Sequence, residues 1–176
     1  MTRWLTLVPL AILVALALMF GLHSLGRDPE VKPRTLIGQP MPDLTLADMV
    51  DGQPRRLADL AKDGPILVNF YASWCGPCKV EHPQLMALKA QGVRIVGIDY
   101  KDIPPMGSPA AARAMIASLG DPFSAKLADA NGRAGIDFGI TGVPETFVIG
   151  RDGKIVDKHV SAVMPADAER LAALLR

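Results

Sequence analysis

The segment that most constrains this chain is Ile66–Lys79, with the sequence ILVNFYASWCGPCK. Its first part, Ile66–Tyr71, is short and rich in β-forming residues, which predicts a buried strand. The spacing of apolar residues over 75–89 predicts a helix directly after it. Cys75 and Cys78 are the only two cysteines in 176 residues. They are therefore expected where a central strand passes into the first turn of a helix.

That location favours thiol chemistry. The free N–H groups and the positive dipole end of a helix N-terminus favour a thiolate over a thiol at Cys75. Cys78 lies one turn further along, within reach of a mixed disulfide formed at Cys75. Gly76 and Pro77 suit a first turn, because the missing N–H of proline costs nothing there. The pattern predicts a dithiol that performs thiol–disulfide exchange.

Two other uses of a cysteine pair are less favoured. A structural disulfide with a two-residue spacer closes a small loop and constrains little chain. A closed zinc site needs four ligands, and the remaining candidates are His23, His82 and His159. His23 falls in an apolar segment, which makes it a poor ligand. Redox activity is therefore the preferred interpretation.

Longer segments around the motif resemble a known family. The sequence WCGPC after a buried strand is the thioredoxin active-site motif. Together with WCGPCKVEHPQL, the segments GVRIVGIDYKD and GITGVPETFVIGRDGKI resemble the thiol:disulfide interchange proteins of bacterial cytochrome c maturation, the CcmG/DsbE family. The resemblance covers nearly the whole chain. It implies an α/β thioredoxin fold with a mixed central sheet and helices on both faces, in agreement with the expected element order βαβα then ββα.

The N-terminal region is expected to anchor the protein. Leu5–Leu22 carries no charged side chain and approaches the length of about 20 residues that a membrane helix needs. We therefore expect an anchor in residues 1–25, a linker in 26–37 and a thioredoxin-like domain in 38–176. A cleaved secretory signal is the alternative. The flanking charges leave the orientation open, so a periplasmic domain on the inner membrane rests partly on the resemblance.

The resemblance implies a role for Pro144, and Trp74 is a further candidate beside the cysteines. By itself, a proline before a strand is an ordinary strand-start residue. In thioredoxin-like proteins the matching proline is cis and lies against the cysteines. In that position Pro144 would leave the Val143 backbone free to pair with a client strand. It would also prevent metal ions from binding to the thiolates. Trp74 is expected on an exposed recognition face.

Two acids, Glu81 and Glu145, are candidates for tuning the dithiol. Most glutamates are solvated, but an acidic active site is a mark of the family that the chain resembles. Ordinary thioredoxin has a buried aspartate where this chain has Asn69, which cannot transfer a proton. Glu81 or Glu145 could then act as general base for Cys78. His82 is expected on the helix surface, and the segment Tyr100-Lys101-Asp102 is a candidate for partner contact.

The resemblance implies a reductase with no cofactor beyond the Cys75–Cys78 disulfide. Its client would be apocytochrome c or a maturation factor holding it, and a transmembrane thiol reductase would supply electrons. A net charge of +1 gives no indication of a nucleic-acid partner. Alternatives are a tethered reductase for other envelope clients, a peroxiredoxin-type peroxidase, a disulfide-donating oxidase and a copper-binding assembly module that would use His159.

Overall fold

The computed structural model describes residues 7–25 and 36–176, which fall into two separate units. The first contains the helix α1 (Val8–Leu25), and its large apolar side chains that the structure describes are exposed. Across residues 7–25 and 36–176, no helix combines the length and the apolar character needed to cross a bilayer. The anchor expected in residues 1–25 stays a prediction. Of the expected linker, residues 26–35 lie outside the described part of the chain.

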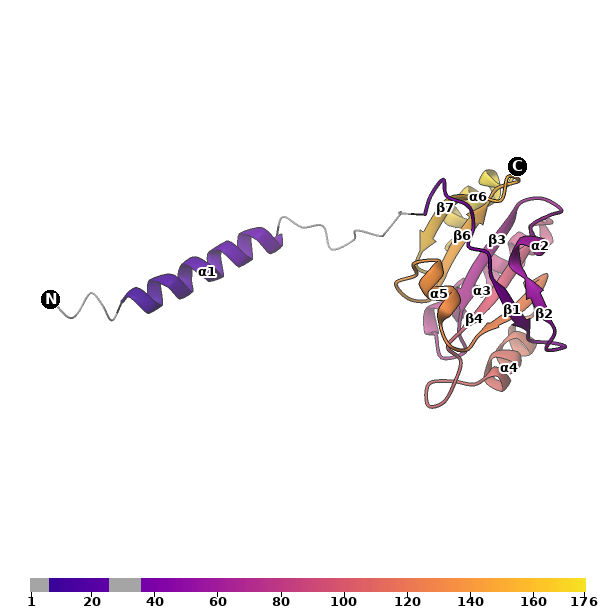
Figure 1. Ribbon diagram of the computed structural model, residues 1–176, viewed down its shortest axis with the longest axis horizontal. Coiled ribbons are helices and arrows are strands. Elements are labelled where there is room, and N and C mark those ends of the chain that lie inside the picture. Colours follow the sequence, from indigo (N-terminus) through magenta and orange to yellow (C-terminus); the bar gives the residue numbers. More distant parts are fainter. Residues whose placement is uncertain (1–6, 26–35) are drawn as a thin grey trace. The chain divides into compact units, whose positions relative to one another are not determined.

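The second unit combines strands and helices around one sheet (Figure 1). Its elements are β1 (Thr45–Asp48), β2 (Pro54–Arg56), α2 (Leu57–Leu60), β3 (Ile66–Tyr71), α3 (Gly76–Ala90), β4 (Ile95–Tyr100), α4 (Pro109–Leu119), β5 (Ala125–Asp129), α5 (Arg133–Asp137), β6 (Glu145–Ile149), β7 (Ile155–Val160) and α6 (Pro165–Leu174). The strand order is β2-β1-β5-β4-β3-β6-β7. Strands β3, β4 and β5 are parallel, whereas the remaining pairs are antiparallel. The expected mixed sheet is confirmed.

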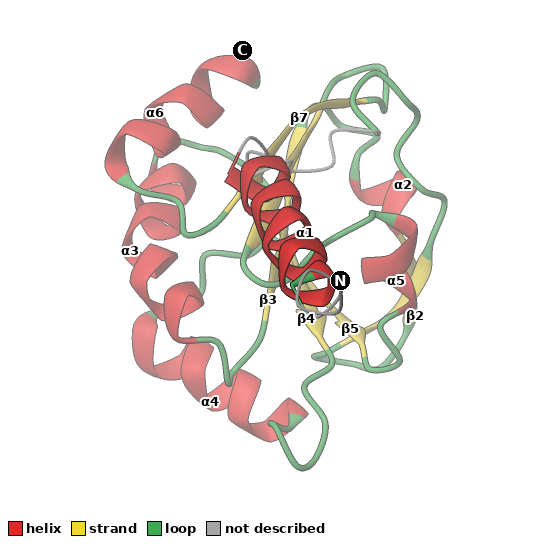
Figure 2. Ribbon diagram, turned by 90° about the vertical axis from the view of Figure 1, so that its left-hand side faces the viewer, coloured by secondary structure: helices red, strands yellow, loops and turns green. Residues whose placement is uncertain are grey.

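Helices cover both faces of this sheet, as expected for a thioredoxin fold (Figure 2). On one face, buried residues of α3, α4 and α6 share an apolar cluster with Leu67 and Tyr71 of β3. On the other, residues of α2 and α5 cluster with Phe70 and Phe147. Because successive side chains of a strand point to opposite faces, β3 supplies both clusters, and all six of its side chains are buried. The active-site strand is therefore enclosed on both of its faces.

The N-terminal part of this unit adds a hairpin that the sequence predicted only in part. The segment 38–46 predicts an entry loop and a short strand, and Asp51-Gly52 predicts a turn. The structure has β1 at Thr45–Asp48, paired antiparallel with β5. The turn is confirmed, with Gly52 at a φ of 73°. Strand β2 was missed because its sequence PRR has no apolar alternation, and its three residues are exposed at the sheet edge.

Candidate functional site

The two cysteines form a disulfide where β3 passes into α3. The S–S distance is 2.04 Å and the Cα atoms are 5.3 Å apart, so the structure shows the oxidised form. Cys75 caps the N-terminus of α3, and its sulfur accepts a hydrogen bond of 3.1 Å from the backbone N–H of Cys78. Both cysteines are nearly buried, whereas Gly76 and Pro77 between them are exposed. The predicted location at a helix N-terminus is confirmed.

Pro144 shares a hollow with the cysteine motif. The Val143–Pro144 peptide bond is cis, as the resemblance implied. A hollow of about 240 Å³ is lined by Pro77 of the motif, by residues 141–145 and by residues 160–162. Most of the surface of this hollow is apolar, which suits contact with the side chains of an extended polypeptide. The site thus combines a disulfide with a neighbouring surface for a protein segment.

Glu81 is a buried acid on the same helix as Cys78. Its Oε1 accepts a hydrogen bond of 2.9 Å from Asn69 Nδ2, and its Oε2 accepts one of 3.0 Å from the backbone N–H of Val163. Burial raises the pKa of Glu81 from 4.5 to about 7, although the bonds from Val163 and Asn69 oppose the shift. The interpretation of Glu81 as a solvated carboxylate is therefore wrong. This acid can exchange a proton near neutral pH, one helical turn beyond Cys78.

Glu145 is also buried, but it is paired with a cation. Its Oε1 accepts hydrogen bonds from the backbone N–H and the hydroxyl of Thr141, at 2.8 and 2.6 Å. Its Oε2 forms an ion pair of 2.8 Å with Nζ of Lys158 in β7. Sequence reasoning missed Lys158, because β7 does not alternate simply: Asp157 and Lys158 are adjacent and both are buried. The solvated interpretation is wrong for Glu145 as well.

Trp74 is less exposed than expected. Its side chain is half-buried against the apolar cluster on the α3 side of the sheet. The indole Nε1 is buried, with no hydrogen-bond partner in the described part of the chain. The turn that carries Trp74 is held by Asp102, whose carboxylate accepts bonds of 2.6 Å from both the backbone N–H and the hydroxyl of Ser73.

These two hydrogen bonds to Asp102 change the interpretation of the segment Tyr100-Lys101-Asp102. Asp102 is only 2% exposed, so it holds the active-site turn instead of facing a partner. Asp99 is also buried. Burial together with the charge of Asp102 raises the pKa of Asp99 to about 8. The expectation for His82 was wrong, because its ring is buried and its Nε2 lies 2.8 Å from the Gly120 carbonyl oxygen.

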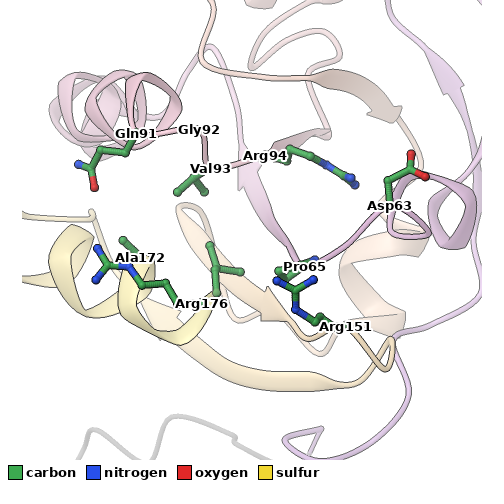
Figure 3. A pocket seen from close by; sticks show the side chains of 10 residues that line it. Asp63, Pro65, Gln91, Gly92, Val93, Arg94, Arg151, Ala172 and Arg176 are labelled. Atoms are coloured by element: carbon green, nitrogen blue, oxygen red, sulfur yellow. The ribbon is translucent and has the colours of Figure 1, made fainter.

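A second hollow of about 530 Å³ lies away from the cysteines (Figure 3). Pro65, which precedes β3, lines it together with Arg94 and Arg151. Cys75 follows the other end of β3, and a strand of six residues spans roughly 20 Å. This hollow is therefore separate from the redox site.

Three features define the class of protein: a disulfide between a strand and a helix, a cis proline near it, and a sheet covered by helices on both faces. They are the features of a thioredoxin-fold protein-disulfide oxidoreductase, in which a cysteine pair exchanges with disulfides of other proteins. Residues 36–175 also match the Redoxin family.

Comparison with known proteins narrows the class. The chain is 42% identical over 165 residues to the thiol:disulfide interchange protein DsbE of Pseudomonas aeruginosa, covering 93% of this chain and 87% of that protein. It is 42% identical over 132 residues to HelX of Rhodobacter capsulatus, covering 74% and 72%. A thiol:disulfide interchange protein from Chlorobium tepidum has a similar structure, with a TM-score of 0.62 at 28% identity, covering 77% of this chain and 94% of that one. The chain belongs to the DsbE family of thiol:disulfide interchange proteins.

Proposed function

We propose that this protein is a membrane-tethered periplasmic reductase. Its client is a disulfide in apocytochrome c, or in a maturation factor that holds it, and reduction prepares the cysteines for haem attachment. The observation that carries the exchange chemistry is the Cys75–Cys78 disulfide at the start of α3, beside the cis Pro144. The reductase direction rests on the Gly76-Pro77 dipeptide, which places no imidazole between the cysteines. The choice of client rests on the resemblance of the segments around WCGPC, GVRIVGIDYKD and GVPETFVIG to proteins of cytochrome c maturation.

The cysteines exchange one disulfide for another. The Cys75 thiolate attacks a client sulfur, forms a mixed disulfide and releases the other client sulfur as a thiolate, which takes up a proton. The Cys78 thiolate then attacks the Cys75 sulfur, releases the second client thiol and forms the Cys75–Cys78 disulfide. Two electrons pass from the dithiol to the client. The hydrogen bond from the Cys78 N–H to the Cys75 sulfur stabilises negative charge on Cys75 before attack.

Glu81 accepts the proton that Cys78 loses in the second step. A general base works best when its pKa lies near the working pH, and burial brings Glu81 to about 7. Asn69 replaces the acid of ordinary thioredoxin and donates a hydrogen bond to Glu81. Glu145 suits this role less well, because its carboxylate already pairs with Lys158 and Thr141.

The tether is the apolar segment Leu5–Leu22, with the catalytic domain on the periplasmic side of the inner membrane. A tether of this kind raises the effective concentration of the domain near other membrane-bound maturation factors. After each turnover, a transmembrane thiol reductase returns the electrons by reducing the Cys75–Cys78 disulfide. No cofactor beyond this disulfide takes part in the proposed cycle.

The proposal is tested by trapping clients on Cys78→Ser in cells that make cytochrome c. Without Cys78 the mixed disulfide at Cys75 cannot resolve, so an adduct with apocytochrome c or a maturation factor is expected in the membrane fraction. The double variant Cys75→Ser/Cys78→Ser is the control and should form no adduct. Adducts with other envelope proteins alone would refute the proposed client, and adducts only in the soluble fraction would refute the tether.

A further inference from the structure

Residues 138–144 connect α5 to β6 and form one side of the hollow beside Pro77. The segment belongs to neither a helix nor a strand, and its Thr141 and Gly142 are exposed. Connecting segments of this kind are more mobile than the elements that they join. A surface that receives a client backbone must keep its shape, so the contacts that hold this segment are important.

Lys158 provides those contacts from the interior of the domain. It lies in β7, in register with Phe147 of β6. Its Nζ donates a hydrogen bond of 2.9 Å to the Gly139 carbonyl oxygen and lies 2.8 Å from Glu145 Oε2. The other oxygen of Glu145 holds Thr141 through two hydrogen bonds. The Lys158 ammonium group therefore contacts Gly139 near the start of the segment and Glu145 directly after its end. Through Glu145 it also holds Thr141 in the middle of the segment.

These contacts depend on each other. The side chains of Lys158 and Glu145 are 3% and 1% exposed, and a charge buried to this extent needs its partner. The Phe147 ring, 5.3 Å from the Lys158 Nζ, adds a cation–π contact. Removing either charge leaves the other buried and unpaired. The arrangement of residues 138–144 therefore depends on the intact ion pair.

We infer that Lys158 is a positioning residue for client docking, because it fixes residues 138–144 opposite Pro77 in the shape that an extended protein segment requires. The inference rests on the proposed function, since it takes the hollow as the place where the client lies. Lys158 does not take part in the exchange reaction itself. A small disulfide, which needs no groove, should therefore react independently of Lys158.

The test compares two substrates with the variant Lys158→Met of the full chain. One substrate is an oxidised peptide containing Cys-X-X-Cys-His, and the other is glutathione disulfide. We expect kcat/KM for the peptide to fall at least tenfold, mainly through KM, and the rate with glutathione disulfide to change less than twofold. Lys154→Met in the preceding hairpin is the matched control, because Lys154 is exposed, and should change neither rate.

The double variant Glu145→Gln/Lys158→Met covers the case in which the single variant does not fold. It leaves no unpaired buried charge, and the amide oxygen of the substituted side chain still accepts from Thr141. It should therefore lose less peptide activity than Lys158→Met but with the same selectivity for the peptide. Equal losses on both substrates, or no loss on either, would overturn the inference. Failure of the wild-type protein to reduce the peptide would instead refute the proposed function.

Discussion

Glu81 and Glu145 have the same side chain but different surroundings. Both were candidates from the sequence. Glu145 lines the hollow beside Pro77, and Glu81 lies one helical turn beyond Cys78 in α3. The sequence did not predict that only Glu145 has a buried lysine partner, whereas Glu81 has neutral donors from Asn69 and Val163. Burial raises the pKa of a carboxylate that has no cation partner. The presence or absence of a lysine partner therefore distinguishes the positioning role proposed for Glu145 from the proton-transfer role proposed for Glu81.

The raised pKa of Glu81 predicts a pH dependence of stability. Folding raises this pKa from 4.5 to about 7, so the native state binds the proton more tightly than the unfolded state does. The contribution of Glu81 to stability is complete below pH 4.5 and is lost as pH rises to about 7. We expect this group to lower the free energy of unfolding by up to about 3 kcal/mol over that range.

Urea unfolding of the wild type and of Glu81→Gln at a series of pH values measures this effect. The variant should show a flatter profile between pH 4.5 and about 7, whatever its absolute stability. Asp99→Asn is a useful comparison, because the pKa of Asp99 is raised to about 8. In the wild type, the contribution of Asp99 to stability should continue to fall above the pKa of Glu81, and Asp99→Asn should lack this later part of the decline. Parallel profiles for wild type and Glu81→Gln would contradict this assignment.

At the scale of elements, the turn between β3 and α3 is held by the loop after β4. Asp102 bonds to Ser73, and Gly107 of the same loop lies against both residues. A Cβ placed on Gly107 would be 1.7 Å from Asp102 Oδ1 and 2.9 Å from the Ser73 hydroxyl oxygen. The absence of a side chain at position 107 thus lets Asp102 hold the turn that carries Trp74 and Cys75.

Gly107→Ala should therefore displace Asp102 and loosen the active-site turn. We expect a loss of about 1–3 kcal/mol in the free energy of unfolding, as for other overpacked sites, and slower reduction of small disulfides. Gly142→Ala is the control for stability, because a Cβ there meets no atom within 4 Å. Thermal unfolding and stopped-flow kinetics measure the two effects, and an unchanged Gly107→Ala protein would show that the loop does not hold the turn.

The sequence predicted the elements better than the contacts between them. Ser108 stands directly before the helical pattern of residues 110–119 and predicts an N-cap. In the structure its hydroxyl oxygen accepts a hydrogen bond from the N–H of Ala111 in α4. Local rules suffice there, because the cap and its partner are close in sequence. The contacts of Lys158 and Asp102 were missed because their partners Glu145 and Ser73 are far from them in the sequence. Whether a polar side chain turns inward depends on the tertiary structure.

At the scale of the whole molecule, the domain of residues 36–176 is built around the Cys75–Cys78 disulfide. The parallel strands β3, β4 and β5 place the cysteines, Asp102 and Asp129 at one end of the sheet, where α/β folds form their sites. Glu81 of α3, which accepts a hydrogen bond from Asn69 of β3, is the buried acid that we propose as the proton acceptor. The central claim of the proposal is that the disulfide exchange at this site runs in the direction that reduces the client.

The equilibrium reduction potential of the Cys75–Cys78 disulfide in the full chain, measured against glutathione, tests that claim most directly. The account predicts a value in the reducing range of roughly −270 to −200 mV. A value near the oxidising end, about −120 mV, would contradict the account and make the protein a donor of disulfides.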